Sequence, residues 1–95
     1  MESNVKKILD LAEVDVNQAL ELLDFVPGAK EAIFQNVSPG PNPALRRFFS
    51  IVAKTETDPE ILHMIGIRDL PTKIRFAVIA NPNTPRKTFE RMARQ

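Results

Sequence analysis

The stretch LPTKIRFAVIANPNTP, residues 70–85, decides the fold of this 95-residue chain. Its apolar residues recur at spacings of three and four, which is the period of an α-helix and not that of a strand. Pro71 and Pro85 each stand at the start of an apolar run. Proline suits the first helical position because it has no N–H to leave without a partner. The stretch therefore predicts a helix over 72–80, a turn, and a second helix over 85–94.

The same pattern occurs earlier, where Asn42-Pro43 and Asp58-Pro59 open two further apolar runs. An Asn, Asp or Thr side chain before a helix can accept a hydrogen bond from a backbone N–H of the first turn, so we expect Thr84 to act in the same way. These signals predict helices over 43–53 and 59–67. The short turns between them favour packing of successive helices within one domain.

The N-terminal segment also has a helical pattern. Residues 4–25 keep one apolar stripe in phase, so they form either one long helix or two stacked short ones. We favour a break near Val14-Asp15, because Asp15 can cap a new helix. Pro27-Gly28 ends this segment, and a short helix follows over 29–35.

A shift of 27 residues superimposes two parts of the C-terminal half and indicates an internal repeat. Phe49 then meets Phe76, and Val52 meets Ile79. We expect both pairs to be buried in equivalent places, so that Phe76→Ala would cost about 3–5 kcal/mol of stability.

The last two predicted helices differ in their apolar faces. The helix over 72–80 is apolar around most of its circumference, which predicts that it is covered on two sides. The last helix carries a narrow apolar stripe among charged residues, which is typical of the polar cap of a repeat array. This stripe comprises Phe89, Met92 and Ala93.

Residues 74–85, followed by Phe89-Glu90-Arg91-Met92-Ala93, resemble the leucine-rich repeat variant family. Repeats of that family read roughly Val-Arg-x-Ala-Val-x-x-Asn-Pro-x-Thr-Pro, with Leu-x-x-Leu-Ala behind. The match is good over about 24 C-terminal residues, fair over 45–67 and poor over 1–42. The resemblance implies a right-handed superhelix of alternating α and short 3₁₀ helices, and a role in interaction. Some members adjoin a cysteine cluster for an iron–sulfur centre, and that activity is not transferred to a chain without cysteine.

The expected fold is therefore an all-α, single-domain, short right-handed helical-repeat solenoid spanning residues 1–95. Residues 1–42 would be divergent acidic helices, and residues 43–95 would be two repeat units of about 27 residues.

Composition limits the possible functions. The absence of cysteine excludes disulfides, thiolate metal sites and a cysteine nucleophile. No apolar run is long enough to cross a membrane, so we expect a cytoplasmic protein without membrane contact. The net charge of +1 hides an asymmetry: residues 1–42 hold three basic and seven acidic residues, whereas residues 43–95 hold ten basic and five acidic ones. Such a split can steer a charged partner or favour head-to-tail association.

Few residues are candidates for chemistry. His63 is the single histidine, and we interpret it as structural because a metal site would need carboxylates from elsewhere. Asp58 and Glu60 could form an acid–base pair but serve better as cap and first-turn residues of a helix. We therefore predict no enzyme, no catalytic residue, no cofactor and no bound metal.

The basic C-terminal half supplies the candidate partner-binding residues, which are Arg75, Arg86, Lys87, Arg91 and Arg94. Three interpretations stay open: a solvated face, a protein-binding face, or a phosphate-binding face for nucleic acid. The lack of Trp and Tyr, with all six phenylalanines apparently in core positions, counts against nucleic acid. Arg75 fills the arginine position of the family, so it could also bond to backbone carbonyls between repeats.

We thus predict a non-enzymatic protein–protein interaction module, with a nucleic-acid-binding repeat as the alternative. The protein would be a monomer or would self-associate weakly and in a salt-sensitive manner. In the second case the basic residues of the last helix would contact the acidic first helices of another copy.

Overall fold

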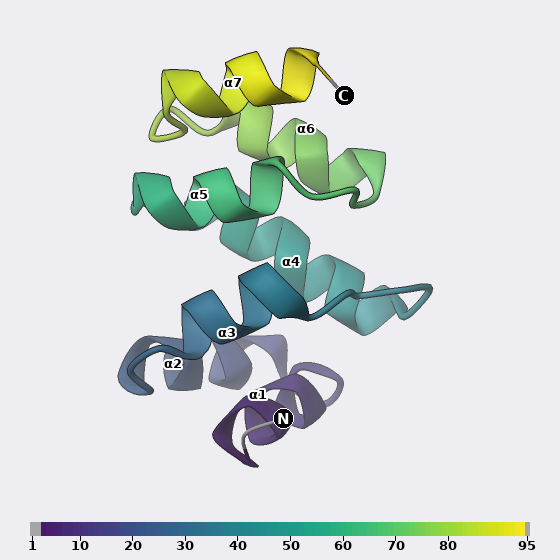
Figure 1. Cartoon of the computed structure of the whole chain (residues 1–95). Helices are drawn as coiled ribbons and strands as arrows, with labels where there is room; N and C mark the ends of the chain where they lie inside the picture. Colours follow the sequence, from purple (N-terminus) through teal and green to yellow (C-terminus); the bar gives the residue numbers. More distant parts are fainter. Residues whose placement is uncertain (1–2, 95) are drawn as a thin grey trace. The chain divides into compact units, whose positions relative to one another are not determined.

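Residues 3–94, which the computed structural model describes, form seven α-helices and no strand (Figure 1). The predicted all-α class is therefore confirmed. No 3₁₀ helix occurs in this range, in contrast to what the resemblance implies. Residues 1, 2 and 95 of the predicted domain lie outside the described residues. The helices are α1 (Ser3–Ala12), α2 (Val16–Phe25), α3 (Ala29–Asn36), α4 (Pro43–Thr55), α5 (Pro59–Gly66), α6 (Thr72–Ala80) and α7 (Arg86–Ala93).

Local capping explains where several helices begin. The Asp15 carboxylate accepts hydrogen bonds from the N–H groups of Asn17 and Gln18, at 3.1 and 3.2 Å, so residues 4–25 form two helices rather than one. Asn42 caps α4 and Asp58 caps α5 through their side-chain oxygens. These three predicted caps are confirmed, and each supplies an acceptor for backbone N–H groups that have no partner within the helix.

The prediction of a proline at the first helical position is wrong for α6 and α7, and so is the capping role predicted for Thr84. Both helices follow a proline, Pro71 or Pro85, that occupies the N-cap position itself and offers no side-chain bond. The buried Thr84 hydroxyl instead donates a 2.6 Å hydrogen bond to the carbonyl of Val78, near the end of α6. Thr84 therefore closes the preceding helix rather than starting the next one.

The chain divides into two compact units, Met1–Phe48 and Phe49–Gln95, with the boundary inside α4. In the first unit, α1, α2 and α3 pack against one another, and the ring of Phe34 stacks on that of Phe48 with centroids 6.2 Å apart. The buried apolar residues of this unit include Val5, Ile8, Ala19, Leu23 and Ile33. The subdivision into residues 1–42 and two repeats over 43–95 stays a prediction.

In the second unit, α5 packs against both α6 and α7. Gly66 permits the close approach of α7, because a Cβ atom at this position would lie 2.5 Å from Cγ2 of Thr88 and 3.1 Å from Cγ1 of Val78. Thr88 is fully buried as a result. The buried apolar residues of this unit include Phe49, Val52, Ala53, Ile61, Leu62, Ile65, Ile74 and Val78.

Asn81, the residue directly after α6, connects α6 to α4. Its buried side-chain amide points its nitrogen at three carbonyl oxygens at the end of α4, those of Ala53, Lys54 and Glu56, at 2.9, 3.3 and 2.9 Å. Its oxygen accepts a hydrogen bond from the N–H of Asn83. The last carbonyls of a helix have no hydrogen-bond donor within that helix. The Asn81 side chain therefore supplies the donor for carbonyls at the end of α4.

The equal burial expected from the 27-residue repeat is wrong. Phe49 and Val52 are buried, but Phe76 and Ile79 are 64% and 46% exposed. The buried apolar residues of α6 are Ile74, Ala77 and Val78, so this helix is covered on one side and not on the two sides predicted. The expectation that all six phenylalanines lie in the core is wrong for Phe25, Phe76 and Phe89, which are exposed.

Candidate protein-binding surface

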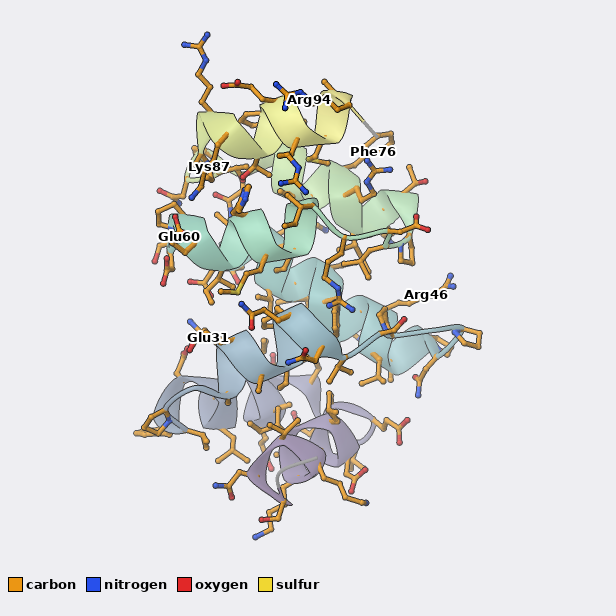
Figure 2. All side chains as sticks on the ribbon, viewed as in Figure 1. Glu31, Arg46, Glu60, Phe76, Lys87 and Arg94 are labelled. Atoms are coloured by element: carbon orange, nitrogen blue, oxygen red, sulfur yellow. The ribbon has the colours of Figure 1, made fainter. Side chains whose placement is uncertain are left out.

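An open apolar groove of about 340 Å³ lies between α6 and α7. Phe76, Ile79 and Phe89 line it, and the exposure of Phe89 is 38%. These are three of the five large apolar side chains that are exposed within the described residues, and Figure 2 labels Phe76 on α6. The remaining lining residues are Thr72, Arg75, Met92 and Ala93. Contiguous exposed apolar surface of this kind marks interaction sites on folded proteins.

Helical periodicity explains why these side chains meet. Residues 72 and 76, like residues 75 and 79, are four positions apart, and the two pairs adjoin, so they form one face of α6. Residues 89, 92 and 93 form one face of α7 by the same rule. The stripe of Phe89, Met92 and Ala93 was predicted correctly as a face, but it lines the groove, and the fully buried residue of α7 is Thr88 instead.

The five candidate basic residues do not gather in one place. Arg75 lines the groove from α6. Lys87, Arg91 and Arg94 are spaced by four and three residues on one stripe of α7, and that stripe lies nearly opposite the groove stripe around the helix. Arg86 lies between these two stripes, with its Nε 3.7 Å from a carboxylate oxygen of Glu90.

The basic stripe of α7 meets an acidic side chain of α5. Nζ of Lys87 lies 2.7 Å from Oε1 of Glu60, and Figure 2 shows the two side chains directed toward each other. Both side chains are about half exposed, so the pair is worth only about 0–1 kcal/mol. This contact partly neutralises the cationic stripe.

His63 has a structural role. Its Nδ1 lies 2.8 Å from the hydroxyl oxygen of Thr88, and the two groups share a hydrogen bond that joins α5 to α7. Burial lowers the pKa of His63 most, Lys87 lowers it further, and Glu60 acts in the opposite direction. The folded protein therefore favours the neutral form of the ring more than the unfolded chain does.

The other chemical candidates are explained by capping. Asp58 accepts a hydrogen bond from the N–H of Glu60 at 2.9 Å, as the sequence predicted for a cap. No group of three or more His, Asp or Glu residues within residues 3–94 could hold a metal ion. No helix in that range is long and apolar enough to cross a membrane.

A second open groove, of about 420 Å³, lies in the first unit. Leu11, Val14 and Leu22 form its apolar part, and Lys7 and Asp10 its charged part. Val14 is 85% exposed in the turn between α1 and α2. The sequence placed Val14 only at the predicted break between two helices. Its place outside the apolar stripe of residues 4–25 is the signal that could have indicated an exposed side chain.

Comparison of the chain with models of protein families, with curated proteins and with solved structures finds no match.

Proposed function

We propose that the protein is a non-enzymatic protein–protein interaction module that binds its partner through the α6–α7 groove. The observation that carries the proposal is the clustering of Phe76, Ile79 and Phe89 in this one groove while most other large apolar side chains are buried. Covering such side chains removes apolar surface from water, which is the main driving force for protein association. Aromatic side chains are also enriched at the centres of protein interfaces.

The proposed architecture is a short right-handed helical-repeat solenoid of the leucine-rich repeat variant type. The motif over residues 74–85 supports it, and so does the packing of α5 against both α6 and α7.

Capture of partners from an extract of the native source tests the proposal. The bait would be the parent chain, Phe76→Ser, or Phe25→Ser as the matched control. Phe25 is 81% exposed on α2 and lies outside the groove, so both changes remove one exposed aromatic ring without opening the core. Nuclease treatment would separate protein partners from those bridged by nucleic acid.

We expect Phe76→Ser to lose partners that the parent and Phe25→Ser retain, with unchanged thermal unfolding in all three. If Phe76→Ser retained every partner, binding through the groove would be excluded. Melting curves establish that any loss does not come from unfolding.

The alternative function is nucleic-acid binding through the stripe of Lys87, Arg91 and Arg94. Its support is the regular spacing of three cations on one face of α7, and the ion pair of Lys87 with Glu60 weakens it. Three phosphate contacts would give a slope of about −2.7 in the logarithm of affinity against the logarithm of salt concentration. Titration of a labelled duplex at several salt concentrations, with Arg91→Glu and the matched control Arg47→Glu, measures this slope. An equal effect of both variants would exclude a specific role of the stripe.

A further inference from the structure

Helix α7 is attached to α5 mainly through one side chain. Within the described residues of α7, Thr88 is the buried one. Its Cγ2 methyl group lies against Gly66, where it occupies the space that a side chain at that position would take. Its hydroxyl oxygen lies 2.8 Å from Nδ1 of His63. Phe89 and Met92 of the same helix line the open groove instead, so the surroundings of Thr88 largely determine how firmly α7 is docked.

The hydrogen bond between Thr88 and His63 has a defined direction. The Thr88 side chain is fully buried, so its hydroxyl proton needs an acceptor inside the protein. Within residues 3–94, Nδ1 of His63 is the one hydrogen-bond partner of this hydroxyl. Nδ1 can accept a proton only when its lone pair is free, which requires a neutral ring with its own hydrogen on Nε2. The buried hydroxyl therefore selects the neutral Nε2–H form of His63.

Protonation of His63 would reverse this hydrogen bond. A charged imidazole carries a hydrogen on each ring nitrogen, so Nδ1 becomes a donor and the Thr88 hydroxyl has to accept. The hydroxyl proton is then left in a buried place without an acceptor, which is unfavourable. The docked position of α7 is therefore compatible with the neutral ring and not with the charged one.

The charged groups around the ring act mostly in the same direction. Burial lowers the pKa of His63 most, Lys87 and Arg91 of α7 lower it further, and Glu60 of α5 raises it. Among the described residues, these three are the charged groups that act on the ring from the helices around it. The two cations belong to α7, so separation of this helix from α5 would also relieve their repulsion of a charged ring.

We propose that His63 is a pH-sensitive switch for the docking of α7, in which the neutral ring holds the helix on α5 through Thr88 and a protonated ring releases it. Release would separate Phe89 of α7 from Phe76 of α6, and the α6–α7 groove would lose one of its two sides. The switch is independent of the proposed function, and only its effect on partner binding through the groove rests on that function.

The uptake of one proton limits the size of the effect. The ring has the ordinary pKa near 6.5 when α7 is released and a lower pKa when α7 is docked. The released state therefore binds the proton more readily, and the opening constant of α7 rises as the pH falls below about 6.5. Between pH 7.5 and 5.5 the rise can reach about tenfold, which is the value for a docked ring that takes up no proton.

Hydrogen exchange of the α7 amides, followed by NMR and corrected for the intrinsic effect of pH, measures the opening constant. His63 is the single histidine of the chain, so its ring signals directly report the position of the hydrogen. Thr88→Val removes the hydroxyl and keeps a methyl group against Gly66, and the matched control Thr88→Ser keeps the hydroxyl and removes the methyl group. His63→Gln removes the titrating group. Circular dichroism establishes that all variants are folded.

We expect the parent to carry the ring hydrogen on Nε2 at pH 7.5, and its α7 opening constant to rise several-fold at pH 5.5 while the amides of α5 stay protected. Thr88→Ser should open more at both pH values but keep the pH dependence. His63→Gln should lose the pH dependence. Thr88→Val should show a weaker one, because no hydroxyl proton is left without an acceptor.

An α7 opening constant that does not change between pH 7.5 and 5.5 overturns the inference, and so does a neutral ring with its hydrogen on Nδ1. The same pH dependence in the parent and in either His63→Gln or Thr88→Val also overturns it. An equal rise of exchange in α5 and α7 contradicts it as well, because the whole unit would then be unfolding. None of these results changes the test of the proposed function, which is partner capture that depends on Phe76 at neutral pH.

Discussion

Helices α4 and α6 have matching sequence patterns and different surroundings. Phe49 and Val52 of α4 are buried, whereas their counterparts in α6, Phe76 and Ile79, are exposed and line a groove. A sequence pattern indicates which side chains share a face, but whether that face is covered depends on a neighbouring helix. The two helices therefore show that the same apolar motif can be buried in the core in one place and exposed along a groove in another.

The largest expected effect comes from removing the two matching rings. Phe49→Ala should cost about 3–5 kcal/mol of unfolding free energy because it leaves a cavity in the core. Phe76→Ala should cost less than about 0.5 kcal/mol because the ring is exposed, which replaces the larger cost expected from the sequence. Urea unfolding of both variants measures the difference, and equal losses would mean that the face of α6 is covered in solution.

A smaller loss of unfolding free energy is expected when the hydrogen bonds of Asn81 between α6 and α4 are removed. Asn81→Ala should cost about 1–3 kcal/mol because it leaves buried carbonyls at the end of α4 without a partner. Asn36→Ala is the matched control. Asn36 also ends a helix, but its amide is exposed and reaches only the carbonyl of Ala32. The same unfolding measurement should show little change for the control, and a comparable loss in both variants would rule out a special role of Asn81.

The pH dependence of stability tests the contact between α5 and α7, where His63 is hydrogen-bonded to Thr88. The lowered pKa of His63 means that the unfolded chain binds this proton more readily than the folded protein does. Stability should therefore fall as the pH decreases through about 6.5, the ordinary pKa of histidine. His63→Gln should lose less stability than the parent between about pH 7.5 and 5.5. Identical pH profiles would show that this proton does not contribute.

The smallest expected effect concerns the exposed ion pair between α5 and α7. A double-mutant cycle of Lys87→Ala and Glu60→Ala should give a coupling energy of about 0–1 kcal/mol that decreases with added salt. The longer contact between Arg86 and Glu90 is a matched comparison within one helix, and its coupling should be smaller still. A coupling well above 1 kcal/mol at high salt would contradict the interpretation of an ordinary surface pair.

Features determined by neighbouring residues could be predicted from the sequence. Asp15, Asn42 and Asp58 cap helices through bonds that span two or three residues, so the sequence located most helices to within one or two residues of the observed ends. The cap predicted at Thr84 was wrong, because its hydroxyl donates instead to the carbonyl of Val78, six residues earlier.

Features that depend on distant contacts could not be predicted. Thr88 is polar and was not counted as core, but the missing side chain of Gly66 lets it pack against α5. The reach of Asn81 to Ala53 spans 28 residues and requires knowledge of how α6 lies on α4. For the candidate site, the sequence pointed to five cations, of which only Arg75 lines the groove, and it assigned Phe76 and Ile79 of the groove to the core.

We expect the side-chain amide of Asn81 to couple the opening of α6 to the opening of the last turn of α4. The N–H of Glu56, which donates to the carbonyl of Val52, belongs to the last turn of α4, and Asn81 holds carbonyls of that same turn. When α6 separates, this turn loses its partner and frays, because local openings of linked segments are cooperative. Hydrogen exchange at Glu56 should therefore report the detachment of a helix that begins 16 residues later in the chain.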